Sequence, residues 1–215
     1  MDLEQARFFM VEQQIRPWEV LDPKILDLFH AIPRHDFVAK DQIPLAYSDI
    51  ELPLPHGQNM LHPKVEARML QALDIDEEES VLEIGTGSGF GTALLASLAK
   101  TVTTVELYPE LQATAKQRLE HFANIDYHIG NAIKDWNDGQ QYDAIILTGS
   151  VAEMPQRYLE KLNLGGRLVV TTGVEPIMTA QLYTRISHDE WDQEDLFETV
   201  MTPLIDAEPK ESFSF

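Results

Sequence analysis

Apolar residues change their spacing along the chain in a way that predicts alternating strands and helices. Short apolar or β-branched runs are typical of strands, and they occupy residues 81–84, 101–106, 125–129, 142–147 and 167–172. Apolar residues three or four positions apart are typical of helices, and they occupy residues 90–99, 108–122 and 154–162. Two further strands, without a crossover helix between them, are predicted at residues 180–187 and 195–205. The pattern predicts a doubly wound, Rossmann-like α/β sheet that is mostly parallel, with an antiparallel strand pair at its C-terminal edge.

The N-terminal residues predict helices rather than strands. Pro17 interrupts a first helix, whose apolar stripe is expected to comprise Phe8, Phe9, Val11 and Ile15. Asp22 as N-cap and Pro23 at the first helical position predict a second helix, which ends before Ile32. These helices are too few for a core of their own, so we expect them to pack on the sheet domain.

A loop connects these helices to the sheet. Residues 46–63 are rich in turn-forming residues and are expected to form an extended loop, which a short helix at residues 65–73 follows. We therefore expect a single domain, with a helical extension and loop at residues 1–76 and an α/β core at residues 77–215.

Residues 81–91 have the sequence V-L-E-I-G-T-G-S-G-F-G, which combines a strand, a glycine-rich turn and the start of a helix. Glycines leave room for a ligand beside the backbone, and they adopt positive φ angles without strain. The first N–H groups of the following helix have no partner within the helix, so they are available to a ligand. The stretch predicts a cradle for a nucleotide-like cofactor.

The spacing of these glycines narrows the choice of cofactor. A dinucleotide motif, G-x-G-x-x-G, would need a glycine at Phe90 or Thr92, and a P-loop would need a lysine before Lys100. The remaining pattern, E-x-G-x-G-x-G beginning at Glu83, is typical of S-adenosylmethionine sites. The Glu83 carboxylate can engage the cationic amino-acid end of that cofactor, directly or through water. The alternative is a glycine-rich turn of some other α/β protein.

Polar groups at the ends of the predicted strands converge on one cleft. Glu106 ends a strand about 20 residues after the first glycine, where an acid is expected to bind ribose hydroxyls. A solvated loop residue is the alternative for a lone glutamate there. Asn131 and Thr148 follow the next two strands, at the edge where such sheets bind ligands. The predicted cofactor site comprises Glu83, Ile84, Gly85, Thr86, Gly87, Ser88, Gly89, Glu106, Leu107, Asn131, Ala132 and Thr148.

Composition excludes several classes of protein. The 215 residues are 44% hydrophobic and 24% charged, as expected for one soluble globular domain. The lack of cysteine excludes disulfides, thiolate metal sites and cysteine nucleophiles, and the formal net charge of -20 disfavours nucleic acid as a partner. His56 and His62 have no third ligand placed by the sequence, so no metal site is expected. Without a secretory segment or a long apolar run, we expect a cytoplasmic protein that does not enter a membrane.

Several further motifs occur in order along the chain. They are M-V-E-Q-Q-I-R at residues 10–16, I-P-R-H-D-F-V at 32–38, A-Y at 46–47, L-P-L-P-H-G-Q at 52–58, A-R-M at 67–69, Y-D-A-I-I at 142–146, G-G-R-L-V at 165–169 and M-T-P-L at 201–204. With the glycine motif, they make the chain similar to the protein-L-isoaspartate O-methyltransferase family over nearly its whole length. The resemblance implies a repair enzyme that transfers the methyl group of S-adenosyl-L-methionine to the α-carboxyl group of isoaspartyl residues in damaged proteins or peptides. S-adenosyl-L-homocysteine would be the second product.

The acceptor side departs from the family pattern. The family loop G-Q-T-I-S-Q-P is here G-Q-N-M-L-H-P, so Leu61 replaces a serine and Asn59 replaces a threonine. The family turn G-D-G becomes Gly-Asn-Ala at residues 130–132, and T-A-A becomes Thr-Gly-Ser at residues 148–150. The catalytic residue is therefore unassigned, and Asn59 and His62 are the candidate donors to a substrate carboxylate.

The same loop is expected to bind the substrate. The expected substrate site comprises Pro53, Leu54, Gly57, Gln58, Asn59 and His62. Because the loop differs from the family pattern, two alternatives stay open: a methyltransferase of the same fold with a different acceptor, and an S-adenosylmethionine-binding protein without catalytic activity. The sequence leaves open the oligomeric state and whether the loop closes over the cofactor.

Overall fold

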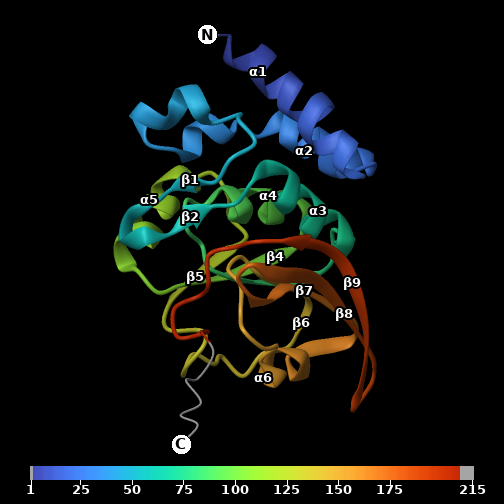
Figure 1. The fold of residues 1–215 in the computed structure, drawn as a ribbon. Helices are drawn as coiled ribbons and strands as arrows, with labels where there is room; N and C mark the ends of the chain where they lie inside the picture. Colours follow the sequence, from blue (N-terminus) through green and yellow to red (C-terminus); the bar gives the residue numbers. More distant parts are fainter. Residues whose placement is uncertain (1, 209–215) are drawn as a thin grey trace, which may run out of the picture.

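A seven-stranded sheet forms the centre of the protein (Figure 1). The computed structural model describes residues 2–208. The strands are β3 (Ser80–Ile84), β4 (Thr101–Glu106), β5 (Ile125–Ile129), β6 (Tyr142–Leu147), β7 (Leu162–Val174), β8 (Ile177–Ser187) and β9 (Glu190–Thr199). Their order is β5-β4-β3-β6-β7-β8-β9, with parallel pairing from β5 to β7 and antiparallel pairing from β7 to β9. The predicted Rossmann-like sheet with an antiparallel C-terminal edge is confirmed.

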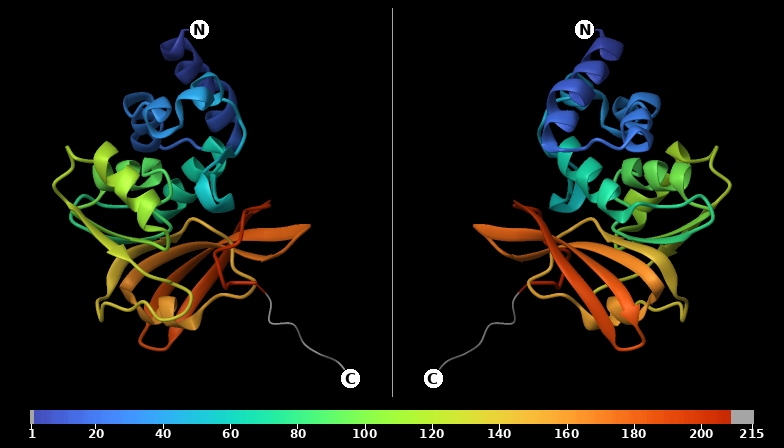
Figure 2. Two further views of the ribbon diagram at one scale, coloured as in Figure 1. Left: turned by 90° about the vertical axis from the view of Figure 1, so that its left-hand side faces the viewer. Right: turned by 90° about the vertical axis from the view of Figure 1, so that its right-hand side faces the viewer.

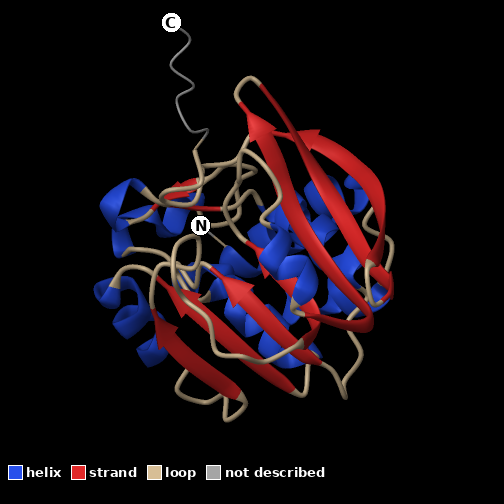
Figure 3. Cartoon of the chain, turned by 90° about the horizontal axis from the view of Figure 1, so that it is seen from below, coloured by secondary structure: helices blue, strands red, loops and turns tan. Residues whose placement is uncertain are grey.

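Helices cover the two faces of the sheet unequally (Figure 2, Figure 3). One face packs against α3 (Pro63–Leu73), α4 (Phe90–Leu98) and α5 (Pro109–Arg118). The other face packs against the short α6 (Gln156–Glu160) and the connection between β5 and β6, which contributes Ile133 and Trp136 to a buried cluster. The helix that follows the glycine-rich turn, α4, is therefore held between the sheet and the N-terminal segment.

The N-terminal segment packs on the helical layer, as expected. α1 (Leu3–Met10) continues as a π-helix (Val11–Ile15) and a 3-10 turn (Arg16–Trp18), and α2 (Pro23–Ala31) follows. The predicted N-cap of α2 is confirmed, because the Asp22 side chain accepts a hydrogen bond from Lys24 N. The aromatic rings of Phe29 and Phe37 contact Phe90 at the start of α4, with centroids 5.8 and 5.4 Å apart. These contacts join the segment to the core of the sheet domain.

The apolar stripe predicted for the first helix is partly wrong. Val11 and Ile15 are fully buried, but Phe8 and Phe9 are 52% and 41% exposed, and Met10 is buried instead. The hydrogen bonds of a π-helix span five residues instead of four, so the buried face does not follow the regular α-helical spacing.

Residues 46–63, predicted to form an extended loop, contain a short hairpin. β1 (Leu52–Pro53) pairs antiparallel with β2 (Asn59–Met60), and a 3-10 turn (Pro55–Gly57) connects them. Leu54 N donates to Gln58 O at 2.7 Å across this turn. The β1–β2 hairpin therefore has a defined conformation beside the sheet.

The three C-terminal strands differ from their predicted ranges, and β8 does so least, since it begins at Ile177 rather than at residue 180. β7 begins at Leu162 rather than at residue 167, and its pairing with β6 jumps from Tyr142↔Leu162 to Ala144↔Arg167, so the glycine pair 165–166 lies in a bulge. β9 covers Glu190–Thr199 rather than residues 195–205. β9 is the edge strand and pairs with β8 alone, so its acidic residues stay exposed. Because the prediction relied on apolar residues, it missed the acidic first half of this strand. Residues 200–205 leave the sheet. Among residues 2–208, no helix is both long enough and apolar enough to cross a membrane.

Candidate active site

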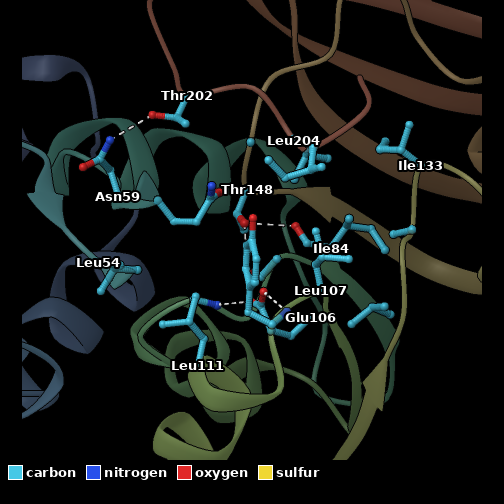
Figure 4. Close-up of a pocket in the computed structure, with 18 of the residues that line it drawn as sticks. Leu54, Asn59, Ile84, Glu106, Leu107, Leu111, Ile133, Thr148, Thr202 and Leu204 are labelled. Carbon is cyan, nitrogen blue, oxygen red and sulfur yellow. Dashed lines mark hydrogen bonds between the residues drawn. The ribbon is translucent and has the colours of Figure 1, made fainter. Parts of the chain in front are cut away.

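The site lies where the strand order reverses, between β3 and β6. Loops at the carboxyl ends of neighbouring strands diverge at this point, which is where open α/β sheets bind ligands. The cleft, together with its solvent-open mouth, has a volume of about 720 Å³ (Figure 4). Its walls come from the loops after β3, β4, β5 and β6, from the β1–β2 hairpin, and from residues 201–205. The predicted convergence of Gly85, Glu106, Asn131 and Thr148 on one cleft is seen, because all four line it.

The glycine-rich turn after β3 forms one wall of the cleft. Gly85 and Gly87 have φ angles of +100° and +53°, which residues with a side chain rarely adopt. Thr148 Oγ1 lies 2.9 Å from Ile84 O and 2.8 Å from Gly85 O. A Cβ on Gly85 would lie 2.3 Å from Thr148 Oγ1. The end of β6 therefore fastens the turn, and only glycine fits at position 85.

The Glu106 carboxylate lies at the end of β4, beside the turn. One oxygen accepts Gly87 N at 2.8 Å, and the other accepts Tyr108 N at 3.0 Å. Glu106 is almost fully buried from solvent yet lines the cleft. Each carboxylate oxygen has a second acceptor site, so the group can accept further hydrogen bonds from hydroxyls in the cleft.

The acid that begins the glycine motif, Glu83, lies deeper than Glu106. It is buried, and one of its oxygens accepts the hydroxyls of Thr92 and Thr104, each at 2.6 Å. Its other oxygen faces Gly91, where a Cβ would lie 3.0 Å from this oxygen and 3.0 Å from Glu66 Oε1. Glu83 and Glu66 both line a smaller cavity, with about 340 Å³ of empty space, that adjoins the cleft at Gly85 and Gly87.

Burial dominates the ionisation of this acidic pair. It raises the pKa of Glu83 to about 8, although the two threonine hydroxyls oppose the shift. It raises the pKa of Glu66 to about 7, although the nearby Arg34 guanidinium opposes that shift. Both carboxyl groups therefore hold their protons over part of the physiological pH range.

Arg34 connects this pair to the β1–β2 hairpin. Its side chain is fully buried, with Nη1 3.3 Å from Glu66 Oε2, and Nη2 donates to Leu61 O at 2.7 Å. Leu61 directly follows the hairpin and lines both cavities. The guanidinium thus fixes the backbone at the position where the family pattern has its serine.

Two further contacts hold the hairpin. The His56 ring stacks on Tyr108, with centroids 4.1 Å apart and planes 3° apart, and its Nε2 lies 3.7 Å from Glu110 Oε2. Asn59 Nδ2 donates to Thr202 Oγ1 at 3.0 Å. The hairpin therefore contacts the start of α5 on one side and the C-terminal residues on the other.

The predicted cofactor residues divide among three places. The cleft is lined by Ile84, Gly85, Gly87, Glu106, Leu107, Asn131, Ala132 and Thr148. The smaller cavity adds Glu83, Thr86 and Ser88. Gly89 lines neither cavity, because it is the N-cap of α4 and packs against Ala115, where a Cβ would lie 3.0 Å from the alanine Cβ.

The predicted substrate residues divide as well. Leu54, Gln58 and Asn59 line the cleft, whereas Pro53, Gly57 and His62 line neither cavity. His62 is the N-cap of α3, and its Nδ1 lies 3.2 Å from Asp49 Oδ1. Within residues 2–208, no three His, Cys, Asp or Glu side chains are grouped as a metal site would require.

Some lining residues escaped the sequence analysis. They are Glu66, Tyr108, Met201, Thr202, Leu204 and Ile205, together with Arg34, which lies behind Leu61. A signal for Glu66 was present, because Met69, Leu70 and Leu73 follow it at three, four and seven positions and form the buried face of α3. A charged residue on such a face needs a partner. Residues 201–204 form the M-T-P-L motif noted in the sequence, but the prediction of a strand there gave no indication that they line the cleft.

The sheet, the glycine-rich turn and the acid that ends β4 define the class of S-adenosylmethionine-dependent methyltransferases. The family model for protein-L-isoaspartate(D-aspartate) O-methyltransferase matches residues 7–209. The chain belongs to this family, as its motifs predicted. The family depends on S-adenosylmethionine, so the predicted class of enzyme and its cofactor are confirmed.

Similar proteins support the same conclusion. The chain is 39% identical over 188 residues to a protein-L-isoaspartate O-methyltransferase of Syntrophus aciditrophicus, which covers 86% of each chain. It is 41% identical over 166 residues to one of Picosynechococcus, which covers 76% of this chain and 75% of that one.

Solved structures share the fold. A protein-L-isoaspartate O-methyltransferase superposes with a TM-score of 0.78 at 22% identity, over 93% of this chain and 65% of that one. A Plasmodium falciparum protein in complex with S-adenosyl-L-homocysteine superposes with a TM-score of 0.79 at 14% identity, over 95% of this chain and 98% of that one. At these identities the likeness supports the fold.

Proposed function

We propose that the protein transfers the methyl group of S-adenosyl-L-methionine to the carboxylate of an isoaspartyl residue in a protein or peptide. The observation that carries this proposal is the meeting of the glycine-rich turn, Glu106 and the β1–β2 hairpin at one cleft. The relatives named for this activity support the acceptor.

In this proposal the larger cleft holds the nucleoside part of the cofactor. Glu106 accepts the ribose hydroxyls, because its carboxylate lines the cleft and keeps unused acceptor sites. Asn131 and Ala132 lie toward the base, and the smaller cavity receives the amino-acid end near Glu83. An ammonium group there would favour the ionised form of the Glu83 carboxyl.

The reaction needs alignment rather than a general base. Methyl transfer is an in-line displacement at the sulfonium methyl, and a carboxylate acceptor with an ordinary pKa near 4 is already ionised at neutral pH. Leu61 and Asn59 lie between the two cavities, so the acceptor would approach beside them. Arg34 acts on the Leu61 backbone and so positions this part of the chain.

A carboxylate acceptor can approach favourably only while the negative charge of the two buried acids, Glu66 and Glu83, is neutralised. A substrate carboxylate would enter beside a cavity that already contains Glu66 and Glu83. The raised pKa of Glu66 reduces this negative charge near neutral pH, and the cofactor's ammonium group would balance the charge of an ionised Glu83. Leucine in place of a hydroxyl removes a hydrogen bond worth about 1.5–3 kcal/mol to a charged group, which slows the transfer but does not abolish it.

The test is to incubate the purified protein with labelled S-adenosylmethionine and a peptide that contains isoaspartate. The control peptide contains aspartate at the same position. We expect a base-labile methyl ester on the isoaspartyl peptide alone. If saturating cofactor yields no ester, the acceptor differs or the protein binds the cofactor without turnover, and the proposal is wrong.

Three further expectations belong to this proposal. Residues 1–76 would form the acceptor side of a single domain and residues 77–215 the cofactor side, of which the last seven lie outside the described part. The enzyme would act in protein repair in the cytoplasm. Nucleic acid is not expected as a partner, since the net charge is -20.

A further inference from the structure

Residues 201–206, which we call the strap, leave the sheet after β9 and form a wall of the cleft. Met201, Thr202, Leu204 and Ile205 line the cleft together with Gly85, Gly87 and Glu106. Figure 4 shows Thr202 and Leu204 on the opposite side of the cleft from Leu111. A cofactor in the cleft would therefore lie between the strap and the glycine-rich turn.

Hydrogen bonds from three separate loops fasten the strap. Asn59 Nδ2 donates to Thr202 Oγ1 at 3.0 Å, and Ser150 Oγ donates to Met201 O at 2.8 Å. Asn131 Nδ2 donates to Asp206 Oδ2 at 2.7 Å. The backbone adds Ser150 N to Thr202 O at 3.0 Å and Leu204 N to Ser150 O at 2.9 Å.

Close packing fastens the strap at a fourth point. A Cβ on Gly149 would lie 2.8 Å from Leu204 Cδ2 and 3.1 Å from Thr202 O. Leu204 can occupy this position only because residue 149 has no side chain. The two residues thus pack directly against each other in the wall of the cleft.

Lys134 also holds the strap, through an ion pair with Asp206 at 2.7 Å. The other four fastening residues are positions at which the sequence departs from its family pattern, as it does at Leu61 and Ala132 too. Asn59, Asn131, Gly149 and Ser150 lie on three different loops, yet each of them contacts the strap. Departures on three separate loops thus meet at one short segment, which indicates that they act on it together. Asn59 also joins the strap to the hairpin, so the two walls of the cleft are linked.

We propose that Asn59, Asn131, Gly149 and Ser150 are positioning residues that hold the strap closed over the bound cofactor and so limit how fast S-adenosylhomocysteine leaves. This inference rests on the proposed function, because the probe is the product of that reaction. Opening of such a segment is often slower than the chemical step. Opening of the strap would therefore set the turnover rate, whereas the acceptor binds at another part of the cleft.

The Asn131 contact offers a test by exchange of partners. Asn131→Asp keeps the oxygen that accepts Ile133 N and Lys134 N, at 3.0 and 3.1 Å, but replaces the donor to Asp206 with a second carboxylate. The double variant Asn131→Asp/Asp206→Asn restores a donor and an acceptor in the opposite order. Asn137→Asp is the matched control, since it adds the same charge to the same exposed loop and keeps its bond from Gly139 N.

The measurement is the rate at which labelled S-adenosylhomocysteine leaves the protein when an excess of unlabelled compound is added. We expect Asn131→Asp to release it roughly three- to tenfold faster, as suits a partly exposed charge contact. The double variant should recover only part of the wild-type rate, because it restores the bond between residues 131 and 206 but loses the ion pair of Lys134 with Asp206. Asn137→Asp should release it at the wild-type rate. The melting temperature of each variant without ligand shows whether the fold is intact.

Two results would overturn the inference. One is a wild-type release rate in Asn131→Asp, and the other is equally fast release from the single and double variants, which would place the effect of Asn131 directly on the ligand. A wild-type protein that does not bind S-adenosylhomocysteine would instead overturn the proposed function. The two failures are therefore distinguishable.

Discussion

The glycine-rich turn and the β1–β2 hairpin face one another across the cleft, but the protein holds them in different ways. The turn is fixed by Thr148 and Glu106, which end the strands on either side of β3. The hairpin is fixed by side chains from distant segments, through Arg34, Tyr108 and Thr202. The cofactor side follows from the sheet itself, whereas the acceptor side depends on contacts that can change without loss of the fold.

The largest loss of stability is expected at Arg34, the buried residue that holds the backbone next to the hairpin. Arg34→Met leaves Glu66 without its cation, and removal of one partner of a buried ion pair typically costs about 3–5 kcal/mol of stability. Folded Glu66 keeps its proton up to about pH 7, whereas the unfolded chain releases it near the ordinary value of 4.5. This group therefore stabilises the fold at low pH, and that contribution is lost as the pH rises through about 7.

The cost of Arg34→Met should accordingly depend on pH. Loss of Arg34 would raise the pKa of Glu66 further, because the guanidinium favours the carboxylate. Urea unfolding should therefore show a larger loss at pH 8.5, where wild-type Glu66 is ionised and paired, than at pH 6, where Glu66 is neutral with or without Arg34. The double variant Arg34→Met/Glu66→Met removes both charges and should recover most of the stability. Equal losses at both pH values would show that Arg34 acts through its bond to Leu61 O rather than through charge.

The next largest effect is expected from a substitution that weakens cofactor binding and leaves the hairpin contacts intact. Glu106→Gln keeps the size of the side chain, but its amide NH₂ then faces one of the N–H groups of Gly87 and Tyr108. We expect S-adenosylhomocysteine to bind about 1.5–3 kcal/mol more weakly, as for a lost hydrogen bond to a charged group. Calorimetry measures the affinity, with Glu120→Gln on the exposed surface as the control. Unchanged affinity would mean that the ribose hydroxyls bind elsewhere.

The difference between the two sides also explains what the sequence could predict. Strand, turn and helix of the cofactor side are neighbours in the chain, and the carboxyl ends of parallel strands meet by topology. Gly85, Glu106, Asn131 and Thr148 could therefore be placed together before the structure was known. Gly89 was grouped with them by spacing, although it packs against α5.

The acceptor side could not be predicted in the same way. The bond between Asn59 and Thr202 joins residues 143 positions apart, and neither residue has a local pattern that indicates the other. His62 was a candidate donor because it lies in the loop, but its ring faces Asp49. The apolar side chains of residues 201–205 predicted a strand, but in the structure they line the cleft rather than the sheet core. Apolar spacing records that a residue is covered, but not what covers it.

The smallest effect tests whether the hairpin and the cofactor side act independently. His56→Ala removes the ring that stacks on Tyr108, a half-exposed aromatic contact worth about 0.5–1 kcal/mol. We expect KM for the isoaspartyl peptide to rise roughly two- to fivefold, with kcat and the affinity for S-adenosylhomocysteine unchanged. His188→Ala, at a residue whose side chain is 89% exposed, is the control. If the cofactor affinity falls as much as KM rises, the hairpin is part of the cofactor site, and the contrast between the two sides is lost.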